Sequence, residues 1–238
     1  MPEAAFSAAA FDLLAGLRRD PTAGFYHTHR AALRAEIEQP LRAVMAGAAA
    51  RFPAAMAARL ETRRNLYSRF LKNDFGAGGA WDHYWAAFYP RGSRRVTDLQ
   101  LAVWLEADLL QVSLYVSEKA QARRALLLRA CARHTWDLLA VLPGLFEGEN
   151  LLLSSSWETI RAPDRRITAA QPLSWAEWLK DPARGLFCLR TAWTRAEALR
   201  LTQADLTEKV ARLHQAYFPL ALACLEENPL PEITAFLG

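Results

Sequence analysis

Residues 99–116, LQLAVWLEADLLQVSLYV, contain two short apolar runs separated by a turn-like stretch at 106–108. In the second run, leucine or valine occupies every even position from 110 to 116, and Gln111, Ser113 and Tyr115 occupy the odd positions. Successive side chains of a strand point to opposite faces, so this pattern predicts a strand with one apolar face. We predict a hairpin of strands 99–105 and 109–116, and an antiparallel sheet, because no crossover helix fits between them.

Helical periodicity dominates the chain before this hairpin. Phe11, Leu14 and Leu17 recur every three residues and predict a helix over 8–19. A second helix is expected to begin near Thr28, with apolar residues at 33, 37, 41, 44 and 48 on one face, and Pro40 either kinks or restarts it. Between these helices and the hairpin, the aromatic-rich segments 62–72 and 83–90 flank a glycine-containing loop at 74–80.

The chain after the hairpin combines two long helices with less regular segments. Residues 119–142 form the strongest predicted helix, which Pro143 and Gly144 end. Another helix spans 202–225 and begins with Thr202 and Asp205, a variant of the capping box. Candidate strands lie near 151–160 and 186–192, and a Trp-bearing helix lies at 174–180.

Helices, then a sheet, then helices predict a single α+β domain over residues 1–238. It would comprise a helical N-terminal layer (1–59), a sheet-rich core (60–118) and a mixed, largely helical C-terminal part (119–238). In the last helix His214 is expected to be partly exposed, while the six apolar-face residues at 206, 210, 213, 217, 220 and 224 offer a stripe for packing or for a partner protein.

The composition excludes several classes of protein. With 238 residues, 52% of them hydrophobic and 23% charged, the chain is globular rather than disordered. Its three cysteines are widely spaced and indicate neither a disulfide framework nor a zinc ribbon. No apolar run reaches the roughly 20 residues of a membrane span, and Glu3 and Asp12 lie where a signal peptide has positive charge. We therefore expect a cytoplasmic protein that does not contact the membrane.

Standard catalytic and metal-binding motifs are missing from the sequence. Neither GxxxxGK[ST] nor GxGxxG is present. His27 and His29 would diverge on a helix, which argues against a metal pair. Asp98 and Glu106 leave a scattered nuclease site open, although no Glu-x-Lys pattern completes it. We predict no catalytic residue, no metal site and no cofactor, and we favour a non-catalytic protein.

Positive charge and aromatic rings coincide between Arg59 and Arg95. This stretch holds eight Lys or Arg residues against three acidic ones, with eight aromatic residues interleaved. Basic side chains neutralise phosphates, and rings stack on bases or hold an extruded one. The alternative is that the rings fill the core and the arginines form a solvated rim. The residues predicted to bind DNA are Arg63, Arg64, Tyr67, Arg69, Lys72, Trp81, Tyr84, Arg91, Arg94 and Arg95.

The segment 60–116 also resembles the N-terminal, non-motor domain of McrB-like AAA+ ATPases of bacterial modification-dependent restriction and phage-defence systems. The motifs that carry the resemblance are YWAAFYP at 84–90, DLQL at 98–101 and the hairpin leucine Leu110. Looser similarity extends to the start, around Phe11, Leu14 and Leu17, and to NPLPEI at 228–233. The resemblance implies a DNA-reading module that senses modified bases. Because this sequence holds no Walker motif, either it is a recognition domain cut from or encoded apart from its motor, with an AAA+ ATPase or nuclease as partner, or the similarity is to the fold only.

Two other functions remain open from the sequence. The first is a protein-interaction module that docks a partner ATPase or nuclease through an apolar face such as that of helix 202–225. The second is a nuclease that uses Asp98 and Glu106.

Overall fold

A central antiparallel sheet organises the protein. The computed structural model describes residues 3–72, 78–117, 119–141, 151–154 and 187–238. Its strands follow the order β1-β2-β3-β4-β6-β5, and each pair of neighbours is antiparallel. This arrangement confirms the predicted α+β class. The strands are β1 (Leu60–Glu61), β2 (His83–Pro90), β3 (Leu99–Glu106), β4 (Leu109–Val116), β5 (Leu151–Ser154) and β6 (Phe187–Thr194).

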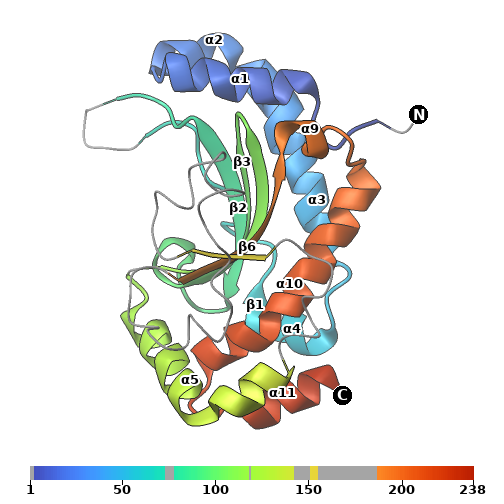
Figure 1. Ribbon diagram of the computed structural model, residues 1–238. Helices are drawn as coiled ribbons and strands as arrows, with labels where there is room; N and C mark the ends of the chain where they lie inside the picture. The colour runs from blue at the N-terminus through green and yellow to red at the C-terminus, as the bar shows by residue number, and fades with distance from the viewer. Residues whose placement is uncertain (1–2, 73–77, 118, 142–150, 155–186) are drawn as a thin grey trace.

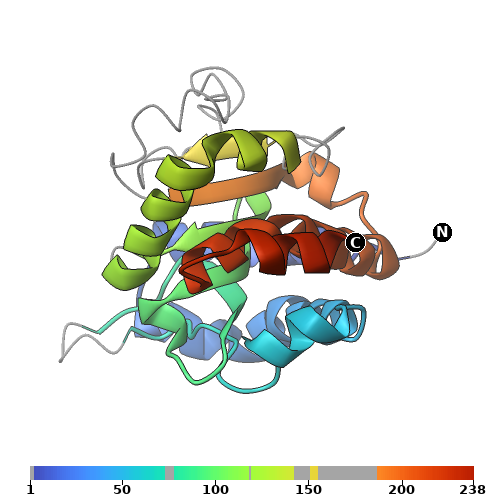
Figure 2. The same ribbon diagram turned by 90° about the horizontal axis from the view of Figure 1, so that it is seen from below.

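Helices cover one face and both ends of this sheet. Long helix α10 packs against α3, α5 and strands β3 and β4. Figure 1 shows α1 and α2 at one end of the molecule and α5 and α11 at the other, and Figure 2 shows α10 between α5 and the N-terminal helices. The helices are α1 (Ala8–Arg19), α2 (Ala23–Leu33), α3 (Gln39–Ala49), α4 (Ala54–Arg59), α5 (Gln121–Val141), α9 (Arg195–Ala198), α10 (Gln203–Leu225) and α11 (Leu230–Leu237), with a π-turn η1 (Arg34–Glu38) and a 3-10 turn η2 (Arg95–Thr97).

The central hairpin forms as its alternation predicts. Glu106 pairs with Leu109 across the two-residue turn, and the register continues to Leu99 opposite Val116. The leucine and valine side chains at the odd positions of β3 and the even positions of β4 are buried against the helices, while Gln111, Ser113 and Tyr115 point to the other face of the sheet. One face of the sheet therefore belongs to the core, and the other carries polar and aromatic groups.

Helix α10 is enclosed on more than one side, which overturns two expectations. Its apolar residues at 206, 210, 213, 217, 220 and 224 are at most 1% exposed, so the face proposed for partner docking already forms part of the protein's own core. His214 is 0% exposed instead of partly exposed, and its Nε2 lies 3.3 Å from the Ala102 carbonyl oxygen. The predicted start is confirmed, since Thr202 and Asp205 form a reciprocal capping box.

The N-terminal helices differ from expectation at one boundary. The predicted helix 8–19 is confirmed as α1, but α2 begins at Ala23 rather than near Thr28. Thr22 caps it by accepting a hydrogen bond from Phe25 N, and Phe25 packs so closely on Gly16 that a Cβ there would lie 2.4 Å from the ring. Pro40 lies in the first turn of α3, directly after the π-turn.

The remaining segments agree with the predictions where the structure describes them. Helix 119–142 corresponds to α5, which has a kink at His134 (φ −126°, ψ 30°) that the periodicity does not predict. The candidate strand 151–160 is described at Leu151–Ser154, as β5, and the candidate strand 186–192 corresponds to β6. Residues 155–160, the helix at 174–180 and Gly76 lie outside the described residues. Residues 62–72 run beside β2 and pair through isolated bridges, Tyr67 with Ala86 and Leu71 with Ala80. None of the described helices is long and apolar enough to span a bilayer.

Candidate nucleic-acid interface

A groove on the outward face of the sheet gathers several of the predicted residues. It has a volume of about 620 Å³ and lies between the segment 65–71, the outward side of β2 and the turn 93–96. We call it the basic groove. Its lining residues are Asn65, Tyr67, Ser68, Arg69, Leu71, Trp81, His83, Trp85, Tyr89, Ser93, Arg94, Arg95 and Val96.

A cationic side chain lies over each of three rings around the groove. Lys72 Nζ lies 4.5 Å from the centroid of Trp81, and the guanidinium of Arg95 lies 4.4 Å from that of Trp85. Arg42, which extends from α3, lies 4.1 Å from Tyr67. These distances are within the roughly 6 Å range of cation–π attraction. The groove therefore combines fixed positive charge with ring systems.

A row of stacked rings crosses β2 and β3. Trp85 and Trp104 are register partners with ring centroids 5.8 Å apart, and His83 stacks on Trp104 at 4.4 Å. Trp81 continues the row at 5.2 Å from His83. A hydrogen bond orients Trp104 within the row, since its Nε1 donates to Glu106 Oε1 at 2.8 Å. We call Trp85, Trp104, His83 and Trp81 the aromatic row.

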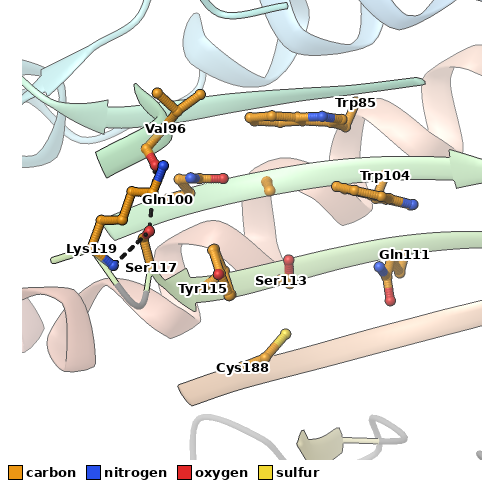
Figure 3. Close-up of a pocket in the computed structure, with 11 residues that line it drawn as sticks. Trp85, Val96, Gln100, Trp104, Gln111, Ser113, Tyr115, Ser117, Lys119 and Cys188 are labelled. Atoms are coloured by element: carbon orange, nitrogen blue, oxygen red, sulfur yellow. Dashed lines mark hydrogen bonds between the residues drawn. The ribbon is translucent and has the colours of Figure 1, made fainter. Parts of the chain in front are cut away.

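A smaller pocket continues from the groove along the same face (Figure 3). It has a volume of about 270 Å³ and shares Trp85 and Val96 with the groove. In Figure 3 the two tryptophans, Trp85 of β2 and Trp104 of β3, form one end and Lys119 and Ser117 lie at the other, and the remaining side chains come from β3, β4, β6 and the neighbouring turns. We call it the amide pocket; it is lined by Trp85, Val96, Gln100, Ala102, Trp104, Gln111, Ser113, Tyr115, Ser117, Lys119 and Cys188.

Hydrogen bonds orient the two amides on the floor of this pocket. Gln100 Nε2 donates to the Arg95 carbonyl oxygen at 2.7 Å, and Gln111 Oε1 accepts from Arg190 Nη1 at 3.0 Å. Arg190 is wholly buried, and its burial lowers the pKa of the guanidinium. Within the described part of the chain, these bonds leave Gln100 Oε1 and Gln111 Nε2 for a ligand. The floor thus offers one acceptor and one donor.

The predicted arginines separate into two groups. Arg69, Arg94 and Arg95 line the basic groove, whereas Arg63, Arg64 and Arg91 line another hollow of about 550 Å³ beside α4. Arg91 donates to the carbonyl oxygens of Ala57 and Leu60 and so supports the local backbone. Among the described residues, none of these six arginines has a carboxylate within ion-pairing distance, which leaves their charge available.

Tyr84 is a wrong prediction. Its side chain is 1% exposed and stacks on Phe70 with ring centroids 4.7 Å apart. Because neighbours in β2 alternate, Tyr84 points to the core and Trp85 points to the groove. The chain thus places Trp85 where Tyr84 was expected, while Tyr67 and Lys72 are half-buried and Trp81 is exposed at the groove.

Other residues of the site were missed, for two different reasons. Trp85 could have been found from strand alternation, once HYWAAFYP was taken as β2. Trp104, Gln100 and Gln111 could not, because only the register between strands brings them beside Trp85. Arg42 reaches Tyr67 from a helix far away in sequence.

The acidic residues do not assemble a nuclease site. Asp98 and Glu106 flank β3 at opposite ends, too far apart to share a metal ion. Asp98 pairs with Arg123 at 3.0 Å, and Glu106 lies 3.6 Å from Arg18. In the part of the chain that the structure describes, no group of three or more His, Cys, Asp or Glu side chains could hold a metal.

The chain matches no protein-family model and no curated protein. Function must therefore be argued from the groove and the pocket.

Proposed function

We propose that this protein is a non-catalytic nucleic-acid-binding module, with DNA as its ligand, and that the basic groove is the binding surface. The observation that carries the proposal is the meeting of unpaired arginines and accessible rings in one hollow. Arg69 and Arg94 are exposed, and Trp81 is 38% exposed beside them. Cations that have no carboxylate partner gain most from a phosphate, since no internal ion pair has to break.

The phosphate backbone would contact the arginine-bearing edge of the groove. Arg69 and Arg94 contribute from opposite walls, the segment 65–71 and the turn after β2. Trp81, which is 38% exposed at the groove, offers a ring on which a base can stack, an interaction that tolerates any base sequence. Arg63, Arg64 and Arg91 in the second hollow would extend the contact along the strand.

The amide pocket suits a single base removed from its stack. Its volume of about 270 Å³ is just below the range of about 300–1,000 Å³ for small-molecule sites, so it fits one heterocycle rather than a larger ligand. Trp85 and Trp104 supply an apolar wall, and Gln100 Oε1 and Gln111 Nε2 can pair with the polar edge of a base. An apolar wall beside that edge accommodates an added methyl group, which supports sensing of modified bases.

This function agrees with the resemblance to McrB-like N-terminal domains. On that basis the protein would act in the cytoplasm, in a restriction or phage-defence system, beside a partner AAA+ ATPase or nuclease. Any docking surface for such a partner would have to lie elsewhere than the apolar face of α10, which is buried.

Fluorescence anisotropy with four labelled probes tests the proposal: plain duplex, duplex with methylated cytosine or adenine, single-stranded DNA and RNA. Each probe is measured at low and at physiological salt. We expect binding to at least one DNA probe, and Trp81→Ala should weaken it by about fivefold or more, the loss of one stacked base. Failure of all DNA probes to bind at low salt would refute the proposal.

A further inference from the structure

Arg95 occupies the ring face of Trp85 on which a base would stack. Its guanidinium carbon lies 4.4 Å from the ring centroid, and Trp104 stacks on the same ring with planes 14° apart. Trp85 thus has the Arg95 guanidinium over its ring and a second indole stacked beside it at a centroid distance of 5.8 Å. Trp104 is fixed opposite Trp85 by the strand register. A base that stacks on Trp85 from the basic groove therefore has to take the place of the Arg95 guanidinium.

Hydrogen bonds hold the backbone around Arg95, whereas its guanidinium has the Trp85 ring as its contact and no hydrogen-bonded carboxylate among the described residues. The Arg95 carbonyl oxygen accepts a hydrogen bond from Gln100 at 2.7 Å, and the carbonyl oxygen of Val96 accepts one from Ser117 at 3.4 Å. By contrast, the buried Nη1 of Arg95 has no hydrogen-bond partner among the described residues, and no described carboxylate pairs with the guanidinium. Burial lowers the pKa of Arg95, and the positive charge of Arg69 acts in the same direction. The cation thus lacks the acceptor that a guanidinium normally finds.

We propose that Arg95 exchanges places with a base when nucleic acid binds: the base takes the Trp85 face, and the guanidinium moves to the phosphate of the same nucleotide. This inference rests on the proposed function and adds a residue that couples base stacking to phosphate recognition. A phosphate supplies the acceptor that Arg95 lacks. A neutral ligand must displace Arg95 without that compensation, so the groove selects bases that carry a backbone phosphate.

The test compares a single-stranded DNA oligomer with a peptide nucleic acid of the same base sequence, which has no phosphates. Both labelled probes are titrated by anisotropy into wild type, Arg95→Ala and the matched control Arg94→Ala. Arg95→Ala should weaken DNA binding by about tenfold, the loss of one charge-assisted contact, and should tighten binding of the uncharged probe by about threefold or more. Arg94→Ala should weaken DNA binding and leave the uncharged probe unchanged.

The opposite pattern overturns the inference. If DNA binds to wild type but Arg95→Ala leaves the uncharged probe unchanged or weakens it, Arg95 supports the Trp85 ring instead of vacating it, and only the exchange is refuted. If neither probe binds to wild type or to Arg95→Ala, the proposed function fails as well. Arg95→Gln, with thermal melting of every variant, separates these outcomes from misfolding.

Discussion

His214 lies wholly inside the protein, with the rings of Phe52 and Phe88 edge-on to its own. Its Nε2 faces the Ala102 carbonyl oxygen, and its Nδ1 has no hydrogen-bond partner among the described residues. Burial lowers the pKa of His214 from 6.5 to about 3, because the charged imidazolium would lose its hydration.

This shift makes folding stability depend on pH. Between pH 6.5 and about 3 the unfolded chain binds a proton at His214 that the folded protein does not, so stability is complete above pH 6.5 and falls on acidification. The loss from this group approaches about 1.4 kcal/mol per pH unit. Urea unfolding at pH 7.5, 6.0 and 5.0 should show a steeper fall for wild type than for His214→Gln. Parallel curves would show that His214 does not titrate in this range.

At the scale of elements, ion pairs of Arg18 link α1 to the turn between β3 and β4. Arg18 lies 2.5 Å from Asp108 and 3.6 Å from both Asp82 and Glu106. Burial raises the pKa of Glu106, and the charge of Arg18 opposes this rise. Arg18→Met should lower the free energy of unfolding by about 1–2 kcal/mol, because the buried carboxylate of Glu106 then loses the attraction of the Arg18 charge. The control Arg19→Met, one residue along the same helix, should have little effect when both variants are unfolded with urea. Equal losses of stability in the two variants would contradict a stabilising role of the Arg18 ion pairs.

The start of α10 provides a second prediction at this scale. Thr202 accepts a hydrogen bond from Asp205 N at 3.1 Å, and the Asp205 carboxylate accepts from Thr202 N in return. Thr202→Ala should cost about 1 kcal/mol of stability, while Thr202→Ser keeps the cap and most of the stability. Chemical denaturation measures both. A serine variant as unstable as the alanine variant would assign the effect to the lost methyl group.

The same scale shows why sequence patterns predict some elements and not others. The hairpin 99–116 and helices α1, α5 and α10 follow from local alternation or periodicity. The predicted start of α2 is too late because the prediction leaves out Thr22 as an N-cap, which accepts a hydrogen bond from Phe25 N. The packing of Phe25 on Gly16 is a contact between two helices that periodicity does not show. His214 was misassigned because a single apolar stripe was assumed for a helix that α3, α5 and the sheet enclose together.

For the whole molecule, the sheet divides the residues into a core side and a ligand side. The sequence could indicate that charge and rings coincide in 59–95, but not which rings reach the surface. Alternation in β2 separates Tyr84 from Trp85, and strand register adds Trp104, Gln100 and Gln111. The interface therefore draws on residues far apart in the chain, which a linear pattern does not reveal.

The salt dependence of DNA affinity tests the central claim most directly. Two double variants each remove two positive charges: Arg69→Ala/Arg94→Ala in the groove and, as the control, Arg19→Ala/Arg200→Ala. Both variants and wild type are titrated with one DNA probe from low to physiological salt. Wild type should give a linear fall of log affinity against log salt, with a slope of about −0.7 to −0.9 per phosphate contacted. The slope of the groove variant should correspond to about two fewer phosphate contacts than that of wild type, and the slope of the control should equal that of wild type. Equal slopes in all three proteins, or binding that does not change with salt, would contradict the basic groove as the phosphate-binding surface.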